Sequence, residues 1–277
     1  MRLSPNVYPK RDGYNPSLHY ANCRRFRYFY PNMEVDLFMP CFVDQLFPDT
    51  GWNVHRVLEN VGCSVLYNPE QTCCGQAAYN AGHWDIARDL ANKFIDDFSG
   101  SRPIVCPSAS CAGYVKNYYA GLLKGTIYSN QYNRLRSQVY EFTDFLVNVL
   151  QVRDVGARFR AKVTYHDSCA ALREYGIKSE PRALLEKVRG LELLEMPDTD
   201  TCCGFGGTFS IKHEPISTAM AQQKVENALS TGAEYIVSTE MSCLMHLDSY
   251  IRKHHLGIRC LHIADILAIS DQGVLFH

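Results

Sequence analysis

The chain has 277 residues, 46% of them apolar, and a formal net charge of −1. This composition is typical of a globular protein with its own core, and the near-neutral charge gives no support for nucleic-acid binding. No apolar run reaches the roughly 18 residues needed to cross a bilayer, and we find no secretory signal. We therefore expect a cytoplasmic protein whose 12 cysteines stay reduced and serve as metal ligands or redox groups.

Residues 1–32 form a segment of different composition. It holds six of the 28 Lys and Arg residues, interleaved with Tyr and Phe, and shows no helical or strand period. Basic aromatic surfaces can bind nucleic acid, but terminal segments without periodicity are more often poorly ordered. We expect a disordered tail, or a true start at Met33, directly before the first strand.

Strand and helix signals alternate through residues 33–152. Short apolar, β-branched runs predict strands at 35–39, 63–67 and 103–106. Amphipathic spacing predicts helices at 52–62, 84–98 and 110–123. This alternation predicts an α/β fold, with a small, mainly parallel sheet and flanking helices.

Residues 153–277 repeat the pattern of the first half, beginning with a predicted strand at 161–165. The strings "VDLFMPC", "GCSVLYNPEQTCCG" and "PIVCPSASC" recur as "AKVTYHDSC", "GLELLEMPDTDTCCG" and "YIVSTEMSC". Four cysteines align between the halves at a nearly constant offset. The sequence therefore predicts an internal duplication, with the two halves at 33–152 and 153–277.

The aligned cysteines all follow predicted strands. In each half one cysteine follows the first strand, a Cys-Cys-Gly follows the second, and another follows the third and opens a helix. Loops at the carboxyl ends of parallel strands form the ligand crevice of such sheets, and the glycine lets the backbone turn so that both adjacent thiols face one point. We expect two four-thiol sites, formed by Cys41, Cys73, Cys74 and Cys111 and by Cys169, Cys202, Cys203 and Cys243.

Four thiolates suit either a tetrahedral zinc ion or an iron–sulfur cluster. A structural zinc site usually shows two Cys-x-x-Cys clips, and neither half has one. Widely spaced ligands with one adjacent pair favour a cluster, and zinc in one half stays open as an alternative.

The strings "QTCCGQAAYNAG", "YHDSC", "DTDTCCGFGGTFSIK" and "MSCLMH" resemble the CCG-domain proteins. These include the cysteine-rich subunit of heterodisulfide reductase and the iron–sulfur subunit of glycolate oxidase. The resemblance is closest to the lactate utilization protein A family and covers residues 33 to about 270. It implies one or two iron–sulfur clusters, [4Fe–4S] in type, in an electron-transferring oxidoreductase component.

The resemblance also implies partners. The family is understood as part of a three-protein system that oxidises L-lactate to pyruvate, so we expect other subunits and an electron acceptor. The alternative is a catalytic redox subunit of the heterodisulfide reductase type, which acts on a disulfide or on another 2-hydroxy acid such as glycolate.

Three further residues are weaker candidates for the site. The cysteine-rich subunit of heterodisulfide reductase ends each motif in Cys-x-x-Cys, whereas this chain has Tyr114 and His246 at the last position, which favours an ordinary four-iron cluster. Cys106 and His246 are possible ligands, with a buried free cysteine and a helix-face histidine as the alternatives. His166 is a candidate catalytic proton relay or a hydrogen-bond donor to a cluster sulfur; the alternative is a packed strand-end histidine.

Overall fold

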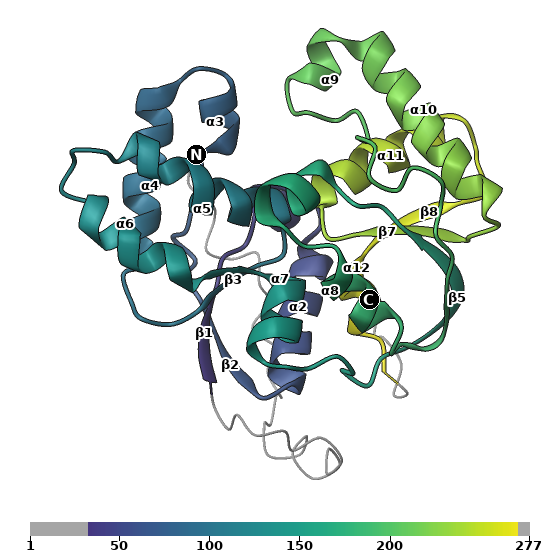
Figure 1. Ribbon diagram of the computed structural model, residues 1–277, viewed down its shortest axis with the longest axis horizontal. Helices are drawn as coiled ribbons and strands as arrows, with labels where there is room; N and C mark the ends of the chain where they lie inside the picture. Colours follow the sequence, from purple (N-terminus) through teal and green to yellow (C-terminus); the bar gives the residue numbers. More distant parts are fainter. Residues whose placement is uncertain (1–32, 271–277) are drawn as a thin grey trace.

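The computed structural model describes residues 33–270, so the basic aromatic segment 1–32 lies outside the described residues. The described chain forms two four-stranded parallel sheets with helices around them (Figure 1). The strand orders, β2-β1-β3-β4 and β6-β5-β7-β8, are equivalent. The predicted α/β fold and its internal duplication are therefore confirmed.

The first half follows the expected alternation. Its elements are β1 (Met33–Leu37), α1 (Cys41–Leu46), α2 (Pro48–Asn60), β2 (Cys63–Tyr67), α3 (Gln76–Asn80), α4 (Trp84–Asp97), β3 (Ile104–Cys106), α5 (Ala109–Leu122), α6 (Ser129–Leu135), the 3-10 turn η2 (Arg136–Gln138), β4 (Val139–Glu141), α7 (Phe142–Asp144) and the π-helix η3 (Phe145–Val149). Helix α2 begins four residues before the predicted start, because Pro48 fits the first helical turn, where its missing N–H has no intrahelical partner.

The second half begins after segment 151–157, which has no regular structure and contains the predicted boundary between the halves. Its elements are β5 (Arg158–Tyr165), the π-helix η4 (Ala170–Tyr175), α8 (Ser179–Leu185), β6 (Arg189–Leu193), α9 (Phe209–Lys212), α10 (Glu214–Ser230), β7 (Tyr235–Ser238), α11 (Met241–Lys253), β8 (Arg259–His262) and α12 (Ile263–Leu267). Among residues 33–270, no helix is long and apolar enough to span a bilayer.

One hydrophobic core joins the two halves. Buried residues of both sheets, among them Val35 and Val163, belong to the same cluster, together with apolar residues of α2, η3, α8 and α12. Figure 1 shows α2, α7, α8 and α12 grouped between the two sheets. The halves therefore share the burial of their inner faces in this cluster, while a second cluster of buried residues, around α4 and α5, lies within the first half.

Polar contacts at this interface follow the duplication. Asp265 accepts hydrogen bonds from Thr50 Oγ1 (3.2 Å) and Asn53 Nδ2 (3.0 Å) across the interface. Its counterpart in the repeat, Asp144, accepts one from the hydroxyl of Tyr175 at 2.6 Å. Two equivalent aspartates thus tie each half to the other.

We expect Asp265→Ala to lower the free energy of unfolding by about 1–3 kcal/mol, because it leaves the buried amide of Asn53 without its acceptor. Urea denaturation measures this loss. Asp85→Ala is the control, since the side chain of Asp85 is 94% exposed and pairs with Arg88 on the surface. A surface pair of this kind contributes no more than about 1 kcal/mol. Equal losses in the two variants would contradict the interface role of Asp265.

Candidate functional site

The eight aligned cysteines lie at the carboxyl edges of the two sheets. In the first half Cys41 begins α1 directly after β1, Cys73 and Cys74 lie in the loop after β2, and Cys111 lies in the first turn of α5 after β3. Because β1 lies between β2 and β3, all three loops leave the same edge, at the point where the strand order reverses. The second half places its four cysteines in the same way.

The first-half thiols form a connected row. The thiol of Cys41 donates to the sulfur of Cys73, with 3.8 Å between the sulfurs. Cys74 contacts Cys73 on one side and Cys111 on the other through sulfur hydrogen bonds. Cys41 is exposed and Cys74 and Cys111 are buried, so the row runs from the surface into the protein.

The second-half thiols form an equivalent row. Cys169 donates to Cys202, and Cys203 hydrogen-bonds with both Cys202 and Cys243. Cys169 and Cys202 are half-buried, whereas Cys203 and Cys243 are buried. The structure therefore brings together all four predicted cysteines in each half.

The glycine of each Cys-Cys-Gly makes the turn that joins the paired thiols to the site. Gly75 and Gly204 have φ of 91° and 94°, in the left-handed region that favours glycine. Each donates its N–H to the first sulfur of its pair, Cys73 or Cys202, at 3.4 Å. A Cβ at Gly204 would lie 2.6 Å from a backbone carbonyl of α10, so this turn also requires the missing side chain for close packing.

Neighbouring thiols shift one another's pKa in opposite directions. Hydrogen bonds from Cys41 and Cys74 lower the pKa of Cys73 well below its usual value, and the N–H of Gly75 adds to this effect. Hydrogen bonding to Cys73 and burial raise the pKa of Cys41. The second half repeats this pattern, with a lowered pKa at Cys202 and a raised one at Cys169. Without a cation, each site therefore ionises only in part.

Two long helices direct their N-terminal ends at the sites. Cys111 lies in the first turn of α5, where its backbone N–H donates to the side chain of Ser108, the N-cap. Cys243 has the same place in α11, whose N-cap is Glu240. The partial positive charge of a helix N-terminus stabilises a thiolate or an anionic metal centre.

Glu240 joins the two sites, a role that no prediction from the sequence included. Its buried carboxylate accepts hydrogen bonds from Ser108 Oγ (3.1 Å), the N–H of Ser110 (2.9 Å) and Ser242 Oγ (3.0 Å), which connects the N-terminal ends of α5 and α11. Burial raises the pKa of Glu240. Glu240 aligns with Ser108 in the repeat. An acidic residue at this position, three residues before the predicted ligand Cys243, was the sequence signal that could have identified it.

The weaker candidates fall in different places. Cys106 is the last residue of β3, fully buried, and its thiol hydrogen-bonds with Cys111, so it belongs to the first-half group. His246 instead forms a hydrogen bond with Ser217 Oγ at 3.1 Å. The remaining described cysteines, Cys63 and Cys260, lie in strands β2 and β8.

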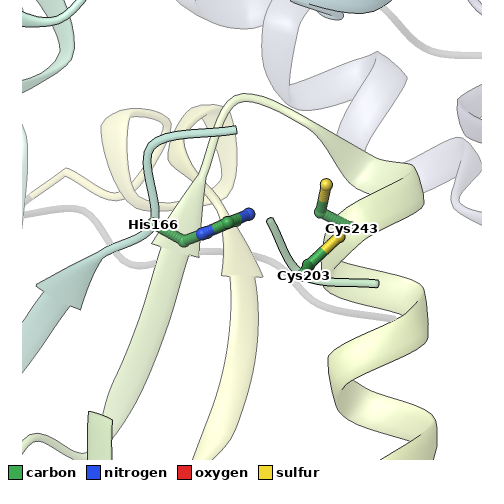
Figure 2. A group of neighbouring side chains, drawn as sticks. All are labelled: His166, Cys203 and Cys243. Carbon is green, nitrogen blue, oxygen red and sulfur yellow. The ribbon is translucent and has the colours of Figure 1, made fainter. Parts of the chain in front are cut away.

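His166 points at the buried thiols of the second half (Figure 2). Its ring nitrogen and the sulfurs of Cys203 and Cys243 all lie within 4.8 Å of one another. Burial lowers the pKa of His166 to about 4, and the nearby charge of Lys224 acts in the same direction. The imidazole is therefore neutral at neutral pH and has a lone pair that can bind a metal.

Comparison with known proteins agrees with this geometry. The cysteine-rich CCG domain matches twice, at residues 35–116 and 163–248. A glutamate racemase from Francisella tularensis aligns over 86% of this chain and 78% of its own, with 11% identity and a TM-score of 0.32, from which we draw no conclusion.

Curated relatives match most of the chain. Lactate utilization protein A of Halalkalibacterium halodurans is 40% identical over 85% of this chain and 96% of its own length. The protein of the same name from Oceanobacillus iheyensis is 40% identical over 87% of this chain and 99% of its own. With two CCG domains and this similarity along nearly the full length of its relatives, the chain belongs to the lactate utilization protein A family of cysteine-rich CCG-domain proteins.

Proposed function

We propose that this chain is the iron–sulfur, electron-transferring component of a cytoplasmic system that oxidises L-lactate to pyruvate. The observation that carries the proposal is that four thiols converge twice, at equivalent sheet edges of one chain. The relatives named for lactate utilization support the substrate. The family resemblance supports two partner subunits, which would supply the lactate-binding site and the route to the electron acceptor.

The donor atoms of the first half fit a cluster better than a single ion. A tetrahedral zinc ion binds four sulfurs at about 2.3 Å, which places all of them about 3.8 Å apart. Cys41 and Cys73 meet that separation, but the thiols continue as a row toward Cys111. Among the described residues, three metal-binding side chains lie within 4.8 Å of one another in the second half, namely His166, Cys203 and Cys243. The first-half thiols form no such compact group among the described residues, which favours a larger, multi-iron group over one tetrahedral ion.

The arrangement suits electron transfer in three ways. A bound iron–sulfur cluster would supply one-electron transfer at each site. Oxidation of lactate to pyruvate releases two electrons and two protons, so two sites in one chain match the two electrons. Cys41 is exposed and Cys169 half-buried, which leaves each site accessible to a partner, while Glu240 links the sites inside the protein.

We expect the chain purified without oxygen to be brown and to contain about eight irons and eight acid-labile sulfides, as two four-iron clusters require. Cys74→Ser and Cys203→Ser should each lose about half of both, because each removes one buried ligand from one site. Iron, zinc and sulfide analysis with the visible spectrum measures the outcome.

Cys63→Ser and Cys260→Ser are the matched controls for these variants. Both cysteines lie in strands of the same two sheets, away from the carboxyl edges that hold the sites. They should keep the full iron and sulfide content. Zinc without sulfide in the unmodified protein would overturn the electron-transfer proposal.

We expect deletion of the gene to abolish growth of its host on L-lactate and to leave growth on glucose unchanged. The unmodified gene and the Cys260→Ser allele should restore growth, whereas the Cys203→Ser allele should fail because it lacks a ligand. Growth curves on the two carbon sources measure this. Normal growth of the deletion strain on lactate, together with disulfide reduction by the isolated chain, would instead favour the heterodisulfide-reductase-like alternative.

A further inference from the structure

The two halves differ at the position that directly follows their first strands, next to the sites. Phe38 and His166 each follow the first strand of their half, and each donates its backbone N–H to the third strand, Phe38 to Val105 (3.0 Å) and His166 to Val237 (2.8 Å). The residues are therefore structural equivalents. The Phe38 ring packs edge-on against Phe94, with ring centroids 4.9 Å apart, whereas the His166 ring extends toward the thiols (Figure 2).

The His166 ring is buried and poorly satisfied. The backbone carbonyl of Thr199 acts on the ring, but neither ring nitrogen makes a hydrogen bond of good geometry. Buried polar side-chain atoms are nearly always satisfied, because an unmade hydrogen bond costs about 1–3 kcal/mol. The atoms in front of the ring are the sulfurs of Cys203 and Cys243. A group bound between these sulfurs and the ring would satisfy the nitrogen.

A backbone carbonyl next to the ring can fix the tautomer of His166. The carbonyl oxygens of Asp198 and Thr199 accept hydrogen bonds from the buried Lys224, the latter at 3.2 Å. The carbonyl of Thr199 also lies close enough to His166 to act on the ring. A metal-bound histidine typically directs its other N–H at such a backbone carbonyl, which fixes the tautomer.

We propose that His166 is a ligand of the second-half metal centre, beside Cys203 and Cys243, whereas sulfur alone binds the first-half centre. This inference rests on the proposed function, because it requires an iron–sulfur cluster in the second half.

The strand ends support the same asymmetry. In the first half the additional donor is the thiol of Cys106, at the end of β3 beside Cys111. The matching residue at the end of β7 is Ser238, whose hydroxyl donates to the backbone carbonyl of His166 at 3.0 Å. Each half therefore has one donor beyond its four aligned thiols, sulfur in the first and imidazole in the second.

Histidine ligation changes what the second centre can do. A neutral imidazole adds no negative charge, whereas a thiolate adds one, and histidine-ligated clusters have higher reduction potentials than all-cysteine ones. The second centre is then the stronger electron acceptor of the two. Electrons that enter the chain at the first half would move toward the second.

Pulsed electron paramagnetic resonance of the reduced protein tests the ligand directly. We expect a strong nitrogen coupling that changes when the histidines carry ¹⁵N. The coupling should be lost in His166→Phe, which installs the residue that the first half has at this position, and should remain in His246→Gln. His166→Cys is a second variant, which should retain iron, lose the coupling and lower the higher of the two reduction potentials.

The outcomes separate this inference from the proposed function. Iron and sulfide without a histidine coupling, or a coupling that persists in both His166 variants, would overturn the ligand assignment and leave the electron-transfer function intact. A chain that binds neither iron nor sulfide would overturn the proposed function, and the ligand assignment with it. Loss of the coupling in both His166 variants, with its retention in His246→Gln, would support the inference.

Discussion

The central constraint on this molecule is that the thiols gathered at each sheet edge cannot all ionise together. A thiol that donates its proton to a neighbouring thiolate stays protonated, and burial and charge repulsion act in the same direction, so Cys41 and Cys74 have a raised pKa where Cys73 has a lowered one. The fold offsets part of this cost with the glycine N–H groups at the Cys-Cys-Gly turns and with the N-terminal ends of α5 and α11. A bound metal cation would supply the remaining positive charge and allow every thiol of a site to ionise together.

The duplication explains why the sites are adjacent as well as equivalent. The helices that carry Cys111 and Cys243 meet through the carboxylate of Glu240, and Phe42, next to Cys41, stacks edge-on against Phe205, next to the second Cys-Cys-Gly turn, at 5.7 Å. A single core beneath the sites holds the two sheets together. The chain therefore holds its two thiol sites next to each other on one shared core, which two separate domains joined by a linker would not do.

Local sequence signals located the main strands and helices and the eight aligned thiols, but they missed short elements such as β4, placed β1 two residues late and gave no contacts between the halves. Strand β2 matched its prediction residue for residue, because apolar periodicity and flanking turns define a strand locally. The repeat aligned Asp144 with Asp265, yet their partners lie in the other half, and Asn53 is 212 residues from Asp265. The same limit applies to His166 and His246. Both lie three residues from a predicted ligand, and only the three-dimensional fold shows that one faces the thiols and the other faces Ser217.

The positions at which the two halves differ say more about function than the positions at which they agree. Two identical centres would have the same reduction potential, and an electron would have no preferred direction between them. The chain differs between its halves in the polar groups beside the sites, with Phe38 against the metal-binding side chain of His166 and Ser108 against the carboxyl group of Glu240. Elsewhere the repeat keeps the thiols, the glycine turns and the strand order. After a duplication the two sites are equal. Divergence at the positions beside each site would give bound clusters different reduction potentials, and electron transfer between them would then have a direction.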